Sequence, residues 1–134
     1  MREVAVLGIG QTPVSEHWEK SLRELAGDAA LAALEDAGQE RADALYVGNM
    51  MSGSANHQQH LGSYIADWIG LRGIEALRLE SACSSGAAAF RAGYIAVASG
   101  EVEIALVVGV EKMSDSPGSE ITSALATAAD ADWE

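Results

Sequence analysis

The sequence of 134 residues contains a single cysteine, Cys83, so no internal disulfide can form. Nothing in the sequence therefore calls for an oxidising compartment. Long apolar runs are also missing, because no segment approaches the roughly 18 apolar residues of a membrane-spanning helix. The apolar stretch in MREVAVLGIG is too short for a secretory signal peptide. These absences predict a soluble cytoplasmic protein.

Basic residues are few: 8 Lys and Arg stand against 20 Asp and Glu, giving a net charge of −12. Phosphate binding depends on clusters of Lys and Arg, so nucleic acids and anionic membrane surfaces are not expected as partners. The acidity is typical of a soluble surface. With 49% hydrophobic residues, a chain of this length can bury roughly two-thirds of its unfolded surface in one domain.

Apolar patterning predicts strands that alternate with helices. The capping-box pair Ser21 and Glu24 begins a helix that Gly38 ends, and Gly70 ends a second helix. Strands are expected at 4–9, 44–47, 76–80 and 104–110, helices at 21–37, 61–69 and 84–99, a loop at 48–59 and a weak helix within 119–134. The first strand should be buried, and the run 104–110 is typical of a central strand covered on both faces. The alternation predicts an α/β fold with a layered sheet and parallel pairs.

The helix expected at 84–99 carries one charge, Arg91, and is small or apolar on every side. Such a helix needs cover all round. We expect it to pack against polypeptide outside this chain or against a second copy.

Cys83 directly precedes this helix, and two interpretations of it are open. At a helix start, free backbone N–H groups and the helix dipole stabilise a thiolate. The same N–H groups can donate to an oxyanion on an acyl carbonyl, and one such donor is typically worth about 3 kcal/mol. A strand-to-helix turn favours a nucleophile, whereas free cysteines are in general often buried as small hydrophobic residues.

Other candidate sites are weaker. His17 lies in a charged stretch and is expected to face solvent. His57 and His60 could form a Cys/His pair or a metal site with Cys83, but the spacing of a recognised zinc site is lacking, so surface or capping roles are favoured and no metal is expected. The segment GIGQTP at 8–13 lacks the third glycine of a dinucleotide-binding loop and is interrupted by Pro13.

Several motifs in order and spacing resemble the thiolase superfamily, most closely its archaeal-type and sterol-carrier-like acetyl-CoA acetyltransferases. They are the opening VAVLGIGQTP, the segment VGNMMSG followed by HQQHLGSYIADWIGL, and ESACSSGAAAFRAGYIAVASGEVEIALVVGVEKMS. The resemblance covers residues 1–134 and identifies them as an incomplete N-terminal domain, with the C-terminal half absent.

The resemblance implies an α/β fold of two similar halves, each a layered mixed sheet, with a buried central helix after the nucleophilic cysteine. Members of the superfamily act as dimers or tetramers in lipid metabolism, and the homodimer is expected here. Cys83 would accept the acyl group from an acyl-CoA, and its own backbone N–H would contribute to an oxyanion hole. The acyl group then passes to a second acyl-CoA carbanion or to CoA. Coenzyme A thioesters are substrates, so no cofactor is implied, and some relatives work with a zinc-ribbon and OB-fold partner.

The family's catalytic histidine and much of its CoA-binding loop belong to the part that has no counterpart here, and no histidine of this chain inherits that role. We therefore expect a fragment or one subunit of a two-part enzyme, with a reactive thiol but without efficient turnover alone. The alternative is a non-catalytic or aldolase-type thiolase-like protein that acts as an assembly subunit with a partner chain. The retained Cys83 favours acyl transfer.

Overall fold

The computed structural model describes residues 1–133, in which three parallel strands form one sheet in the order β2-β1-β3. The strands are β1 (Ala44–Gly48), β2 (Glu75–Leu79) and β3 (Ala105–Gly109). The helices are α1 (Leu22–Asp36), α2 (Ser52–Ala55), α3 (Leu61–Trp68), α4 (Ser85–Ser99) and α5 (Gly118–Ala126). The predicted α/β fold with parallel pairs is confirmed. A mixed sheet would also contain an antiparallel strand, and residues 1–133 contain none.

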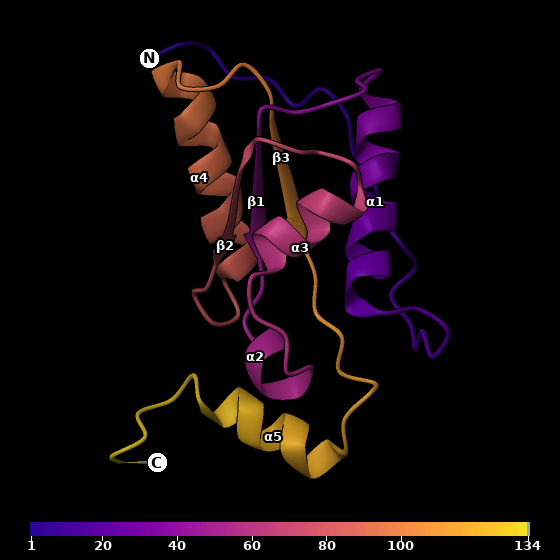
Figure 1. Cartoon of the computed structure of the whole chain (residues 1–134). Coiled ribbons are helices and arrows are strands. Elements are labelled where there is room, and N and C mark those ends of the chain that lie inside the picture. The colour runs from indigo at the N-terminus through magenta and orange to yellow at the C-terminus, as the bar shows by residue number, and fades with distance from the viewer. Residues whose placement is uncertain (134) are drawn as a thin grey trace.

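Helices cover both faces of the sheet, α1 and α3 on one face and α4 on the other (Figure 1). Helices α2 and α5 lie beyond the ends at which the strand arrows point, and they contact each other. The carboxyl ends of the strands therefore face the loops that join β1 to α2, β2 to α4 and β3 to α5.

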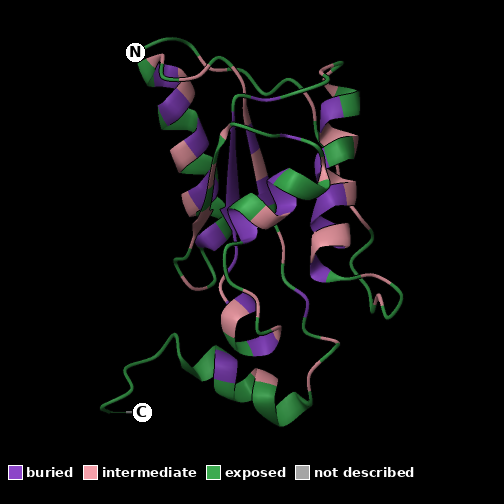
Figure 2. Ribbon diagram, in the orientation of Figure 1, coloured by how far each residue is buried: buried purple, intermediate pink, exposed green. Residues whose placement is uncertain are grey.

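All five residues of β1 are buried (Figure 2). Because side chains alternate along a strand, Leu45 and Val47 pack into the cluster with α1 and α3. Ala44 and Tyr46 pack against Ala89 and its neighbours on α4. The central strand of the sheet is thus β1, and its two side-chain rows hold the two helical layers.

Local signals in the sequence set the helix ends as predicted. The capping box is present, with Ser21 N–H donating to Glu24 at 2.7 Å and Glu24 N–H donating to Ser21 Oγ at 3.4 Å. The Ser21 hydroxyl also donates to the Glu24 carboxylate at 2.6 Å, and this bond, together with the one from Ser21 N–H, lowers the pKa of Glu24 below its usual value. Gly38 and Gly70 follow α1 and α3 with φ of 63° and 78°, a backbone region that glycine enters without steric cost.

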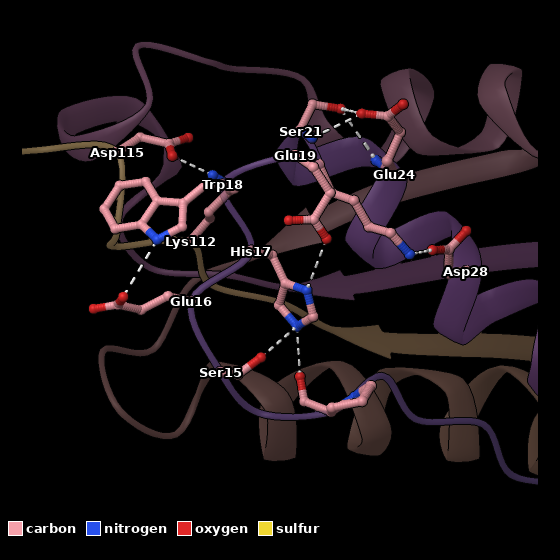
Figure 3. Close-up of polar contacts among 12 residues, drawn as sticks. Ser15, Glu16, His17, Trp18, Glu19, Ser21, Glu24, Asp28, Lys112 and Asp115 are labelled. Carbon is pink, nitrogen blue, oxygen red and sulfur yellow. Dashed lines mark hydrogen bonds and ion pairs between the residues drawn. The ribbon is translucent and has the colours of Figure 1, made fainter.

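The loop before α1 is held by its own polar side chains (Figure 3). The prediction that His17 faces solvent is wrong, since its side chain is only 15% exposed. The cause is local: His17 Nε2 lies 2.7 Å from the Pro13 carbonyl oxygen and 3.1 Å from Ser15 Oγ. Lys20 closes the loop onto α1 through an ion pair with Asp28 at 2.5 Å.

The prediction of a buried strand at 4–9 is wrong. This segment has no ladder partner within residues 1–133, and Val6, Leu7 and Ile9 are 69%, 56% and 76% exposed. A strand requires pairing of its backbone groups, which the apolar pattern alone does not reveal. The segment is anchored at its two ends instead, by Arg2 N–H donating to the Ala98 carbonyl at 2.9 Å and Ile9 N–H to Asp36 at 2.8 Å.

Two further expectations need correction. The run 104–110 forms β3, but β3 lies at one edge of the sheet rather than at its centre. Its continuous apolar character reflects helices on both faces, which a strand at the edge can also have. The expected loop 48–59 contains the short helix α2. The other elements fall within two residues of their predicted bounds, and α5 confirms a helix in the predicted tail region.

No helix in residues 1–133 is long and apolar enough to cross a membrane.

Candidate functional site

Cys83 lies in the short turn that joins β2 to α4, at the carboxyl edge of the sheet. Its side chain is exposed and forms no disulfide. The interpretation of this residue as a buried filler is therefore wrong. The thiol is instead accessible, on the side of the sheet where the loops of the strands gather.

The turn itself has an unusual backbone. Ala82, directly before the cysteine, has a φ of 46°, a region that costs an alanine roughly 1 kcal/mol or more. Hydrogen bonds hold it there: Ser85 Oγ donates to the Ala82 carbonyl at 2.7 Å, and Ser81 N–H donates to Ser85 Oγ at 2.9 Å. Ser84 N–H donates to the Ser81 carbonyl at 2.9 Å. The turn is thus fixed by its own serines, and it projects Cys83 outward.

The first turn of α4 keeps unpaired amide donors. The N-cap residue Ser84 makes no capping bond with its side chain, because Ser84 Oγ donates to the Ser81 carbonyl at 2.7 Å. In the described chain the N–H groups of Gly86 and Ala87 have no acceptor. Free amides and the positive end of the helix dipole therefore lie next to the thiol, an arrangement that favours an anion.

The start of α4 packs tightly against the end of β1. A Cβ added to Gly48 would lie 2.5 Å from the Ser85 carbonyl oxygen and 2.7 Å from the Gly86 backbone nitrogen. Only glycine permits so close an approach. Because the end of the central strand supports the first turn of α4, it also fixes the position of Cys83.

Polar residues at the ends of the neighbouring strands hold the surrounding loops. Asn49 is fully buried, and its Nδ2 donates to the Val110 carbonyl at 2.8 Å while its Oδ1 accepts from Ser52 N–H at 3.0 Å. The carboxylate of Glu111 accepts hydrogen bonds from the N–H groups of Met50 and Met51. These bonds tie the loop after β1 to the loop after β3.

A second set of polar contacts continues this network. Asn56 Nδ2 donates to the Lys112 carbonyl at 2.9 Å, and Arg78 donates to Ser52 Oγ and to Gln59 Oε1, each at 3.2 Å. The sequence reasoning assigned no role to these residues. A positional signal was available for Asn49 and Glu111, which follow β1 and β3 within two residues, because polar residues at the carboxyl ends of parallel strands lie at the edge where α/β folds form their sites.

The remaining histidines do not assemble a centre with Cys83. His57 and His60 lie in the loop before α3 with φ of 52° and 59°. Within residues 1–133 no group of three or more His, Cys, Asp or Glu side chains could hold a metal ion.

The sequence profile of the family described as "Thiolase, N-terminal domain" matches residues 4–132. This chain belongs to that family. Two curated relatives match along the whole of this domain. An acetyl-CoA acetyltransferase of Methanothermobacter thermautotrophicus is 49% identical, and one of Methanocaldococcus jannaschii is 45% identical. The thiolase domain described here spans 35% and 34% of their lengths, so these relatives are about three times longer.

Solved structures resemble the thiolase domain in fold. The acetyl-CoA acetyltransferase of Syntrophomonas wolfei is 25% identical and superposes with a TM-score of 0.73, over 84% of this chain and 29% of that chain. The 3-oxoacyl-[acyl-carrier-protein] synthase III of Aquifex aeolicus, 23% identical, shares the fold with a TM-score of 0.66, over 74% of this chain and 32% of that one. The thiolase-like fold predicted from the sequence is confirmed.

Proposed function

We propose that this chain supplies the nucleophilic part of a thiolase-type acyltransferase. The Cys83 thiolate attacks the carbonyl carbon of an acyl-CoA, a sulfur–carbon bond forms, and the CoA thiolate leaves. The acyl group then passes either to the carbanion of a second acyl-CoA, in a Claisen condensation, or to CoA, in thiolytic cleavage. The observation that carries the proposal is the exposed thiol beside the open amides of α4, and relatives named acetyl-CoA acetyltransferase support it.

Each part of the turn has a task in this reaction. The strained φ of Ala82 directs the sulfur away from the core. The N–H groups near the start of α4 stabilise the thiolate, and together with the N–H of Cys83 they can donate to the oxyanion that forms on the acyl carbonyl. Gly86 and the alanines after it keep the helix narrow, so an acyl-CoA can approach closely.

The proposal requires residues that this chain does not offer. A cysteine nucleophile normally works with a base, and within residues 1–133 no hydrogen bond joins Cys83 to a histidine, since His17 contacts Pro13 and Ser15 instead. We propose that the polypeptide corresponding to the remaining two-thirds of the relatives supplies the base and the CoA site, so that residues 1–134 are an incomplete thiolase N-terminal domain with little turnover alone. Four expectations from the sequence stay predictions. They are the homodimer, the zinc-ribbon and OB-fold partner, the place in lipid metabolism and the cytoplasmic location.

A chimera tests the proposal. In it, this chain replaces the matching third of the Methanothermobacter thermautotrophicus acetyl-CoA acetyltransferase, and the release of CoA from acetyl-CoA is followed. The chimera should release CoA, and Cys83→Ala should abolish the release. Ser63→Ala, an exposed change on α3, serves as the matched control and should retain activity. An active Cys83→Ala chimera would exclude the proposed nucleophile.

One observation favours a second function, that of a non-catalytic or aldolase-type assembly subunit. Helix α4 exposes Phe90, Tyr94 and Ile95, which are 56%, 44% and 42% accessible. Large apolar side chains gathered on one helix mark a surface that another chain covers. Light scattering separates the outcomes: a stable monomer would contradict the assembly role. An oligomer that forms no acyl adduct would support it over acyl transfer.

A further inference from the structure

Ser85, the first residue of α4, has a buried hydroxyl close to the exposed thiol. The residue is only 4% exposed, although it directly follows the turn that carries Cys83 from β2 to α4 (Figure 1). Its neighbour Ser84 is exposed, and the Ser84 hydroxyl contacts only Ser81. Burial shields the hydrogen bonds of the Ser85 hydroxyl from competition with water, which strengthens them.

Both hydrogen bonds of the Ser85 hydroxyl have a fixed direction. Ser81 N–H donates to Ser85 Oγ at 2.9 Å, and Ser85 Oγ lies 2.7 Å from the Ala82 carbonyl oxygen. A carbonyl oxygen can only accept, and a hydroxyl has one hydrogen, so this hydrogen points to the Ala82 carbonyl. Ser85 N–H donates to the same oxygen at 3.1 Å. One residue therefore holds the Ala82 carbonyl with two donors.

The Ala82 carbonyl belongs to the same peptide group as the N–H of Cys83. This peptide is trans, and in a planar trans peptide the C=O and the N–H point in opposite directions. Because Ser85 holds the carbonyl against the start of α4, the Cys83 N–H is directed away from Ser85. Within residues 1–133 this N–H has no hydrogen-bond acceptor. It is therefore free to bind a group that approaches the thiol.

The direction and the strength of the Cys83 N–H both depend on the held carbonyl. Ala82 has a φ of 46°, and such a conformation persists only where the surroundings retain it. Rotation of the peptide to relieve the strain would turn the Cys83 N–H together with the carbonyl. Hydrogen bonds to a carbonyl also polarise its peptide and make the N–H a stronger donor. The Ser85 hydroxyl thus orients this donor and strengthens it.

We infer that Ser85 is a positioning residue for acyl transfer, whose hydroxyl holds the Ala82–Cys83 peptide so that the Cys83 N–H meets the oxyanion of the acyl group. This inference rests on the proposed function. When the thiolate sulfur bonds to the acyl carbon, the π electron pair of the carbonyl moves onto oxygen. When the carbonyl forms again, the bond to the CoA sulfur breaks and CoA leaves as the thiolate. The negative oxygen exists only between these steps, so the Ser85 hydroxyl should affect the rate and not the binding of acyl-CoA.

Two reactions of the same thiol separate this role from a merely structural one. Acetyl-CoA acetylates Cys83 through an oxyanion, whereas iodoacetamide alkylates it by displacing iodide from a saturated carbon, without an oxyanion. Both are followed in the chimera by mass spectrometry of the peptide that contains Cys83. Ser85→Ala should lower the maximal rate of acetylation about ten- to a hundredfold and keep KM within about twofold. The rate of alkylation should change little, since the thiol stays exposed.

Two variants serve as controls. Ser85→Thr retains the hydroxyl and should restore acetylation. Ser99→Ala is the matched control, because Ser99 Oγ donates to the carbonyl three residues earlier, that of Ala96, at 3.0 Å and at the far end of the same helix. Both of its reaction rates should stay within about twofold of those of the unchanged chimera.

A second pair of measurements covers variants that do not fold. For an unfolded Ser85→Ala chimera, Ala82→Gly is added, because glycine adopts a positive φ without steric cost. The double variant should still acetylate slowly, since its peptide can rotate. For an unfolded parent chimera, this chain alone is treated with p-nitrophenyl acetate, which also reacts through an oxyanion. Ser85→Ala should slow that acetylation roughly two- to tenfold, as expected for one exposed hydrogen bond, and leave alkylation unchanged.

The outcomes distinguish this inference from the proposed function. An equal loss of acetylation and alkylation in Ser85→Ala would overturn the inference, because the hydroxyl would then only place the thiol. Unchanged acetylation in Ser85→Ala, or full acetylation in the double variant, would also overturn it while leaving Cys83 as the nucleophile. A folded chimera in which Cys83 takes no acetyl group would refute the proposed function, and the inference with it.

Discussion

Replacement of Gly48 by alanine tests whether the end of β1 positions the nucleophile turn. The added Cβ would lie 2.5 Å from the Ser85 carbonyl oxygen, and the first turn of α4 has to move by about 0.9 Å to restore an ordinary contact of 3.4 Å. Overpacking of this kind costs about 1–3 kcal/mol. A misplacement of about 1 Å at a reacting group can lower its rate on the order of a hundredfold.

The neighbouring strand offers a matched control. Gly109 is the register partner of Gly48 on β3, and a Cβ at Gly109 meets no atom within 4 Å. Neither glycine has a positive φ, so alanine fits both backbones. Gly48→Ala and Gly109→Ala therefore differ mainly in the contact with α4.

Two assays measure the effect. Urea unfolding of this chain should show a loss of about 1–3 kcal/mol for Gly48→Ala and a change within about 0.5 kcal/mol for Gly109→Ala. In the chimera, acyl transfer to Cys83 should fall for Gly48→Ala and persist for Gly109→Ala. Equal stability and equal acylation rates of the two variants would refute the argument that β1 supports the turn.

Three further changes test the fold and the turn. Ser21→Ala removes the capping-box partner of Glu24 and should lower the unfolding free energy by about 1 kcal/mol, measured by urea unfolding; no loss would contradict the capping role. Burial and a 2.6 Å hydrogen bond to Glu75 raise the pKa of Tyr46 to about 12. The fold favours the neutral phenol, so the contribution of Tyr46 to stability should be constant below pH 10 and should be lost between about pH 10 and 12. Tyr46→Phe should remove that component of the pH dependence, and an unchanged profile would show that Tyr46 is not its source. Ala82→Val places a β-branched residue at a φ of 46° and should cost about 1–3 kcal/mol. Ala82→Gly should stay within about 1 kcal/mol of the unchanged chain, and equal losses would contradict strain at this turn.

Elements that depend on their own sequence could be predicted. The capping box of Ser21 and Glu24 begins α1 as expected, and Gly38 and Gly70 follow the helices that they were predicted to end. The position of Cys83 before α4 also followed from the local sequence, because a strand and a small-residue helix meet there. These features arise from neighbours along the chain.

Features that depend on distant partners could not be predicted. The apolar pattern of 4–9 indicates a strand, yet pairing requires a neighbour that residues 1–133 do not supply. The same applies to β3, whose apolar run does not reveal which of its edges is paired. The contacts of Asn49 and Glu111 join loops about sixty positions apart. Such contacts become visible only when the sheet brings the strand ends together.

Location of the acyl group tests the central claim most directly. The chimera is incubated with acetyl-CoA alone, quenched in acid and digested, and the peptide that contains Cys83 is examined by mass spectrometry. The account predicts one acetyl group on the sulfur of Cys83 and none anywhere in the Cys83→Ala chimera. An acetyl group on another residue, with Cys83 unmodified, would contradict the assignment of this thiol as the acyl acceptor.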